Sequence, residues 1–224
     1  MATIFQTLRF KYSVCTKLKY TYNMQPLKII VTGPIRVIFQ LYNLYTGKTT
    51  ISNFLADATE IPYDYHPTKG VRILEFEVQN INVNNKHIAK DIELWDCSGD
   101  HKFESCWPAI KKDVHGVILV YNGKSNECLK EIQQLYDYFI DQTKLDPDRC
   151  AIFCYDPEKR NPEISKIISS TFMKVSHVKC NIESGGSKLK ADFASFISTI
   201  LNKMHHYINQ EDKNILNENI LFTK

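Results

Sequence analysis

Apolar residues occur along the chain in short runs, separated by longer segments of helical periodicity. Several runs are apolar at nearly every position, which is typical of strands buried on both faces of a sheet. The predicted strands cover residues 27–32, 71–78, 88–95, 116–122, 150–155 and 174–180. Asn84 and Asn85 tolerate positive φ and therefore predict a tight turn, which makes the second and third strands an antiparallel hairpin.

Between the other strands, apolar residues recur at the three- and four-residue spacing of an amphipathic helix. The predicted helices lie at about residues 49–58, along the stripe from Ile132 to Phe139, at 164–172, and along a long last stripe from Leu189 to Met204. Strands that alternate with helices indicate an α/β fold, with a doubly wound, six-stranded, mostly parallel sheet in three layers. Ligands of such sheets bind at the carboxyl ends of the strands, so the residues at these ends are the candidates for a functional site.

The sequence Thr46-Gly47-Lys48-Thr49-Thr50 lies between the first strand and the first helix. This order of strand, loop and helix is the context of a phosphate-binding loop, and it predicts a P-loop NTPase fold. Gly47 allows backbone N–H groups to turn onto phosphate oxygens, and the following helix points its positive dipole end at the same anion. We expect Lys48 to contact the β- and γ-phosphates and Thr49 to offer a hydroxyl to Mg²⁺.

The loop departs from the expected spacing. The candidate first glycine, Gly33, is separated from Gly47 by 13 residues, whereas the motif has four. Removing residues 37–45, which are uncharged and mostly apolar, restores the motif. This insert is either a real insertion that bulges outward and leaves residues 46–50 to bind phosphate alone, or it is absent from the functional protein, as a retained intron or a gene-model error. We favour the second interpretation.

Two further positions have the residue types of a nucleotide site. Asp96 and Gly99 follow the third strand, where Asp96 is predicted to hold Mg²⁺ through water and the Gly99 N–H to contact a γ-phosphate. Thr68, in the polar loop before the second strand, is the candidate switch threonine, whose oxygens are expected to reach Mg²⁺ and the γ-phosphate. The predicted metal site therefore comprises Thr49, Thr68 and Asp96.

Together, the Gly-Lys-Thr motif, Thr68 and the Trp95-Asp96-x-x-Gly99 sequence resemble Ras/Rab-type small GTPases. Longer blocks are similar to the narrower family of intraflagellar transport protein 22, also called Rab-like protein 5. The blocks are residues 46–49 with 53–55, residues 67–76 and residues 93–109, and the resemblance covers about residues 26–207 apart from the insert.

This resemblance implies a small-GTPase fold that binds GTP or GDP with Mg²⁺. It also implies a subunit of intraflagellar transport complex B that docks on a coiled-coil pair of partner subunits. The expected locations are the cytoplasm, the cilium or flagellum, and the basal body.

The sequence also departs from the pattern of active Rab-type enzymes. Asp100 stands where they have Gln, and an ionised Asp accepts hydrogen bonds without donating any, so we expect weak or no hydrolysis. The Asn-Lys-x-Asp motif that reads guanine is missing, although Asp156 or Glu158 offers a carboxylate there. Residues 180–182 replace the usual Ser-Ala-Lys, which leaves the base preference open.

Three functional hypotheses follow from these observations. We favour a nucleotide-binding subunit of intraflagellar transport with little hydrolysis. The alternatives are an active switching GTPase in membrane or ciliary trafficking, against which Asp100 argues, and a pseudo-GTPase whose insert prevents nucleotide binding.

Length and charge limit the remaining classes. The 224 residues suit one domain, which we place at residues 24–207, after a basic extension at 1–23 and before a polar tail at 208–224. The extension contributes +4 to a net charge of +3, so the remainder gives no electrostatic reason to expect nucleic-acid binding. No apolar run approaches the roughly 18 residues of a membrane span, and the last four residues contain no Cys for a prenyl anchor.

Several other residues have simpler explanations. His205 and His206 are adjacent on a helix and diverge in direction, and no acid is evident that would orient His101 toward Cys106 as a nucleophile pair. The seven cysteines include no Cys-x-x-Cys, which suits reduced thiols. Trp107 is either a core residue or an exposed partner anchor, and we expect residues 103–107 to contribute to docking.

Overall fold

The computed structural model describes residues 25–35, 37–39, 42–44, 47–58, 67–121, 127–155, 172 and 174–221. Several sequence predictions therefore lie outside the described residues. They are the extension at 1–23, Thr46, the loop residues Asp156 and Glu158, and all but the last residue of the predicted helix at 164–172.

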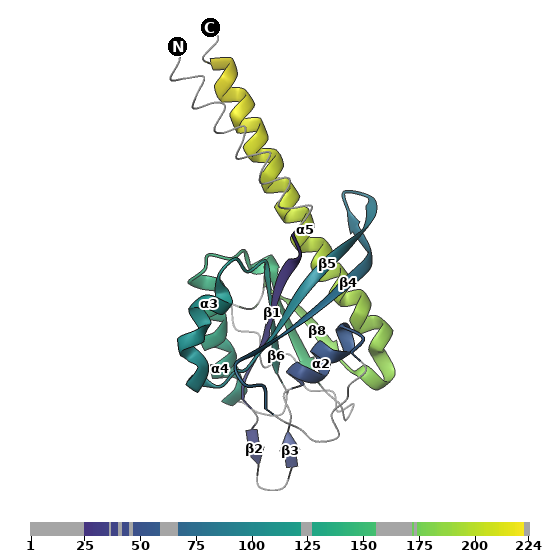
Figure 1. Ribbon diagram of the computed structural model, residues 1–224, viewed down its shortest axis with the longest axis vertical. Helices are drawn as coiled ribbons and strands as arrows, with labels where there is room; N and C mark the ends of the chain where they lie inside the picture. The colour runs from purple at the N-terminus through teal and green to yellow at the C-terminus, as the bar shows by residue number, and fades with distance from the viewer. Residues whose placement is uncertain are drawn as a thin grey trace.

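A six-stranded sheet forms the centre of the molecule, in the order β4-β5-β1-β6-β7-β8 (Figure 1). Its strands are β1 (Leu27–Thr32), β4 (Val71–Val83), β5 (Lys86–Cys97), β6 (Gly116–Tyr121), β7 (Cys150–Tyr155) and β8 (Ser176–Cys180). Every neighbouring pair is parallel except β4 and β5, which are antiparallel. The predicted six-stranded, mostly parallel sheet is confirmed.

Helices cover both faces of this sheet and form the two outer layers of the fold (Figure 1). The main helices are α2 (Lys48–Leu55), α3 (Trp107–Lys111), α4 (Glu127–Tyr136) and α5 (Ile182–Leu221). β1 is buried along its whole length. Because successive side chains of a strand point to opposite faces, its residues enter two cores in alternation. Ile29 packs in the cluster that contains Phe193 of α5, while Ile30 packs in the cluster that contains Ile132 of α4.

The β4–β5 hairpin is longer than predicted at the end that carries its turn. Asn84 and Asn85 have φ of 49° and 62°, as the sequence predicted for this turn. The extra length is stabilised by α5, because Asn202 accepts a hydrogen bond from the Asn84 N–H at 3.0 Å and donates one to the Asn82 carbonyl at 3.2 Å. The final helix thus holds the outer end of the hairpin.

Helix α5 extends well beyond the stripe that predicted it. It begins at Ile182, has a non-helical residue at Gly185, and continues to Leu221, so residues 208–221 of the predicted polar tail are helical. No Gly or Pro follows Gly186 within the helix, which removes the usual reasons for an earlier end. Figure 1 shows its last turns projecting away from the sheet. No helix in the described part of the chain is both long and apolar enough to cross a membrane.

The insert contains two short strands, β2 (Val37–Phe39) and β3 (Tyr42–Leu44). They pair with each other in antiparallel register, with Val37 opposite Leu44, and they form a sheet separate from the central one. Figure 1 shows this ribbon extending away from the domain. Its shape agrees with an insertion that bulges outward; whether the insert is part of the functional protein remains a prediction.

Candidate functional site

Glycines bring the ends of three strands into close backbone contact at the carboxyl edge of the sheet. A Cβ atom on Gly33, which follows β1, would lie 1.9 Å from the Val120 carbonyl oxygen of β6. A Cβ atom on Gly99, which follows β5, would lie 1.9 Å from the Gly33 carbonyl oxygen. Neither position accepts a larger residue without a backbone shift. Gly33 and Gly99, both predicted nucleotide contacts, therefore lie next to each other where the backbone requires glycine.

Gly47 directly precedes α2 in a left-handed conformation, with φ of 84°. Its carbonyl oxygen accepts the hydrogen bond of the Ile51 N–H at 2.8 Å, which begins the helix. A Cβ atom here would lie 2.4 Å from the Tyr155 ring at the carboxyl end of β7. Sequence reasoning missed Tyr155 as a site residue, although its place at a strand end was a usable signal.

Lys48 closes the loop in space despite the insert. Its Nζ atom donates to the carbonyl oxygens of Gly33 at 3.2 Å and Pro34 at 2.6 Å. The start and the end of the long loop therefore meet, with the insert between them. Thr50, another predicted nucleotide contact, is exposed in the first turn of α2.

The three predicted metal ligands lie together. Thr49 donates from Oγ1 to Oδ2 of Asp96 at 2.9 Å, and the hydroxyls of Thr49 and Thr68 are 3.2 Å apart. Asp96 is fully buried, and its Oδ1 atom has no hydrogen-bond partner among the described residues. Buried polar atoms normally have partners, and an all-oxygen set is the chemistry that Mg²⁺ prefers. This cluster therefore fits a magnesium ion held partly through water.

Arg72 is a fourth member of this cluster that sequence reasoning missed. Its Nη2 atom donates to Oδ1 of Asn53 at 2.5 Å and lies 3.4 Å from Oδ2 of Asp96. The alternation of β4 places Arg72 on the same face as Leu74 and the partly buried residues beyond it. A charged residue in this apolar series was the signal that should have identified it.

Electrostatics at Asp96 balance burial against nearby donors and cations. Burial raises the pKa of the Asp96 carboxyl, because the ionised form loses its hydration. The hydrogen bond from Thr49 and the charges of Arg72 and Lys48 oppose this increase in the pKa. The carboxylate thus depends on neighbouring positive charge, as expected of a group that serves a cation site.

Asp100 stands in the usual Gln position, and its side chain bonds to the 3₁₀ helix that follows it. It caps the 3₁₀ helix η1 (His101–Cys106) by accepting from the Lys102 N–H at 3.0 Å, and it pairs with Lys102 Nζ at 2.6 Å. The hydrogen bonds from Lys102 lower the pKa of Asp100. The side chain is therefore ionised at neutral pH and accepts hydrogen bonds without donating any.

Trp107 is a core residue, so its interpretation as an exposed partner anchor is wrong. It is 3% exposed, and its ring centroid lies 5.1 Å from that of Tyr138 and 5.5 Å from that of Phe139. The predicted docking role of residues 103–107 cannot include this side chain, because α3 directs it into the cluster with α4. Sequence alone left this choice open since both roles use an aromatic residue.

The remaining candidates are the pair His101 and Cys106 and the pair His205 and His206. His101 lies 3.4 Å from Glu104 Oε2 and packs beside Trp107, while Cys106 is exposed. His205 and His206 contact residues one turn further along α5, and the described residues contain no cluster of metal-ligating side chains of the His, Cys and carboxylate type.

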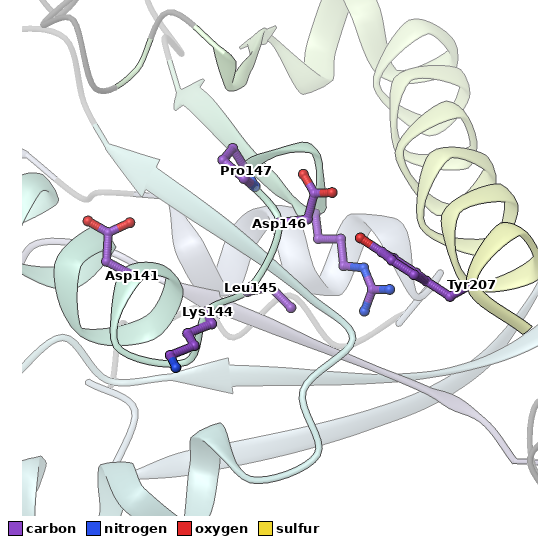
Figure 2. Close-up of a pocket in the computed structure, with 7 residues that line it drawn as sticks. Asp141, Lys144, Leu145, Asp146, Pro147 and Tyr207 are labelled. Atoms are coloured by element: carbon purple, nitrogen blue, oxygen red, sulfur yellow. The ribbon is translucent and has the colours of Figure 1, made fainter. Parts of the chain in front are cut away.

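A separate pocket of about 600 Å³ lies at the amino end of β7, far along the strand from Tyr155 (Figure 2). It is lined by Asp141, Lys144, Leu145, Asp146, Pro147, Arg149 and Tyr207. It contains none of the predicted nucleotide or metal residues. The adjacent ion pairs of Lys203 with Asp146 and Asp148, at 3.0 and 2.7 Å, join this corner to α5.

Comparisons with known proteins agree with this arrangement. Residues 43–155 match the family described as Ras of Complex, Roc, domain of DAPkinase. The chain is 36% identical over 194 residues to the intraflagellar transport protein 22 homolog of Rattus norvegicus, covering 86% of this chain and all of the relative.

Solved structures support the fold. A GTP-bound IFT22/74/81 structure from T. brucei aligns with a TM-score of 0.63 and 23% identity, over 82% of this chain and 99% of that one. A GDP-bound T. brucei IFT22 structure aligns with a TM-score of 0.56 and 22% identity, over 79% of this chain and 97% of that one.

Proposed function

The chain belongs to the intraflagellar transport protein 22 family of Ras-like small GTPases, and we propose that it is a nucleotide-binding subunit of intraflagellar transport complex B. In this proposal it binds GTP or GDP with Mg²⁺ and hydrolyses GTP slowly or not at all. Its role is to make protein contacts in cilium assembly and ciliary transport, stabilised by the nucleotide.

The observation that carries the proposal is the meeting of Thr49, Thr68 and Asp96. These residues come from a helix, a loop and a strand. The Thr49 hydroxyl lies within hydrogen-bonding distance of both the Thr68 hydroxyl and the Asp96 carboxylate. Because Thr49 donates its hydroxyl hydrogen to Asp96, its oxygen keeps a lone pair for a cation besides the one that faces Thr68. When bound, Mg²⁺ neutralises the charge of the phosphates. The solved neighbours are GTP-bound and GDP-bound structures, which supports a guanine nucleotide for this chain.

The loop residues supply the remaining phosphate contacts in this proposal. Gly33, Gly47 and Gly99 permit close approach of backbone to phosphate, and Lys48 supplies a positive charge beside the same loop. Thr46 and Thr50 complete the predicted set of nucleotide contacts.

Slow hydrolysis follows from the chemistry of Asp100. A Gln at this position accepts from the attacking water and donates to the transition state, whereas the Asp100 carboxylate only accepts. Its bonds to Lys102 also hold it at the start of η1. A charged acceptor beside phosphate disfavours the transition state, so we expect turnover to be slower than in a Gln-bearing enzyme.

The proposed partners are a coiled-coil pair of complex B subunits. One solved neighbour is described as IFT22 together with 74 and 81, which supports partners of this kind. We propose that the protein is found in the cytoplasm, the cilium or flagellum and the basal body, and that such protein contacts determine this distribution.

A titration with fluorescent GDP and GTP in the presence of Mg²⁺ tests nucleotide binding. We expect Lys48→Ala to abolish measurable binding, because the loop loses the positive charge that we place at the phosphates. Lys130→Ala is the matched control, since this exposed lysine lies on α4. Equal affinities for wild type and Lys48→Ala contradict the proposal, and absence of binding in the wild type favours a pseudo-GTPase whose inserted β2–β3 ribbon disrupts the loop.

A further inference from the structure

Arg72 connects three elements around the predicted metal site. It lies on the edge strand β4, and its side chain contacts Asn53 on α2 and Asp96 on β5. Its side chain is 41% exposed, whereas that of Asp96 is fully buried. The guanidinium therefore reaches inward from the protein edge to a carboxylate that water does not contact.

The charge of Lys48 also acts on Asp96, but among the described residues the carboxylate makes its side-chain contacts with Thr49, which is neutral, and with Arg72. Thr49 gives Oδ2 a neutral hydroxyl donor, and Oδ1 has no hydrogen-bond partner in the part of the chain that the structure describes. Arg72 forms an ion pair with Asp96, with Nη2 at 3.4 Å from Oδ2. A buried carboxylate without a counter-charge is strongly destabilising, so this contact matters most when no metal ion is bound.

The same contact has a second consequence for the cation. Arg72 and a magnesium ion both draw on the negative charge of Asp96, so a fixed guanidinium makes the site less attractive to Mg²⁺. It also preserves the arrangement of α2, β4 and β5 when the ion leaves, because Arg72 holds Asn53 and Asp96 together.

We propose that Arg72 is the resident counter-cation of Asp96, which balances this buried carboxylate in the metal-free state and reduces the dependence of nucleotide binding on Mg²⁺. This inference rests on the proposed nucleotide function and names a positioning residue within that site. Arg72 acts through Asp96 and Asn53, and the proposal requires no contact between Arg72 and the nucleotide.

The first test is a double-mutant cycle on protein without metal or nucleotide, in EDTA. Arg72→Gln removes the charge and keeps a side chain of similar length, and Asp96→Asn removes the need for that charge. We expect Arg72→Gln to lower the melting temperature by several degrees and Arg72→Lys to lower it less. In the Asp96→Asn background, we expect Arg72→Gln to have little further effect. Additive effects in the cycle overturn the proposal.

The second test measures the Mg²⁺ dependence of nucleotide retention. Protein loaded with fluorescent GDP is titrated with Mg²⁺, and the rate of nucleotide release is followed with and without EDTA. We expect the half-saturating Mg²⁺ concentration of Arg72→Gln to be about threefold to tenfold lower than that of the wild type. In EDTA, we expect Arg72→Gln to release the nucleotide faster than the wild type. Arg72→Lys should stay close to wild type, because it keeps the charge.

The outcomes separate this inference from the proposed function. Unchanged half-saturation and unchanged release in Arg72→Gln overturn the counter-cation role even if nucleotide binds well. If the wild type binds no nucleotide, the proposed function fails, and the double-mutant cycle in EDTA alone decides whether Arg72 balances Asp96.

Discussion

Thr49 donates a hydrogen bond from its side-chain hydroxyl to Oδ2 of Asp96 at 2.9 Å, although the two residues are 47 positions apart. Thr49 occupies the first turn of α2, and Asp96 lies near the carboxyl end of β5. The parallel register of β1 with β5, in which Val31 lies opposite Asp96, brings this strand end beside the loop that leads to α2. One sheet register thus assembles the candidate cation site.

Asp100→Gln is expected to raise single-turnover GTP hydrolysis by about tenfold or more, because Gln restores a hydrogen-bond donor for the transition state. Asp100→Asn is the matched control, since it removes the charge with a shorter amide that reaches less far. A rate for Asp100→Gln at or below the wild-type rate would place the defect elsewhere in the site. A melting curve should accompany the assay, because Asp100 caps η1 and its replacement is expected to destabilise that helix.

Deletion of residues 37–45 is expected to strengthen nucleotide binding and to leave the fold intact. The β2–β3 ribbon forms its own sheet, so its removal leaves the order of the six-stranded sheet unchanged. The shortened loop regains the spacing in which N–H groups converge on one phosphate.

Thermal melts with and without Mg²⁺-GTP measure this effect as ligand stabilisation. The deletion variant should gain more stabilisation from the nucleotide than the full chain does. A variant that unfolds, or that gains no more than the full chain, would show that the insert belongs to the functional protein.

Trp107→Ala is expected to destabilise the protein by about 3–5 kcal/mol, because it leaves a cavity beside Tyr138 and Phe139. Phe103→Ala, at a partly buried position in η1, should cost clearly less. Urea unfolding of both variants measures the difference. Similar, small losses would contradict the core role of Trp107. A loss of partner binding by Trp107→Ala must therefore be compared with the loss of stability of the same variant.

His115 is expected to make stability fall as the pH decreases. Burial, then the charges of Arg149 and Lys90, lowers the pKa of His115 to about 4 from 6.5, and its Nδ1 atom accepts from the Lys28 N–H at 3.0 Å. Between these two values the unfolded chain binds the proton and the folded protein does not. Stability from this group is thus complete above pH 6.5 and is lost toward pH 4, by up to about 3 kcal/mol.

Urea unfolding across this pH range measures the slope of that loss. His115→Asn should flatten it, because the variant has no group to protonate. His206→Asn, on the exposed part of α5, is the control that should keep the wild-type slope. Identical slopes for wild type and His115→Asn would show that this buried ring does not control the acid response.

The sequence by itself determined the main strands and helices of the domain and their order along the chain. The buried runs in β1, β6 and β7 and the Asn84-Asn85 turn are local signals, because strand burial and positive φ depend on a few neighbouring residues. The chemistry of Gly47-Lys48-Thr49 and of Asp96 was recognisable for the same reason, since each motif directly follows its strand or opens its helix.

Only the tertiary structure decided which side chains meet. Trp107 suited either the core or a partner surface until α3 was placed against α4, and Arg72 was one charge on an edge strand until Asn53 and Asp96 stood beside it. Helix α5 supports the far end of the β4–β5 hairpin through Asn202, which no local pattern indicates. Such contacts depend on the packing of elements distant in sequence, and the burial and charge they produce exist only once the sheet and its helices are assembled.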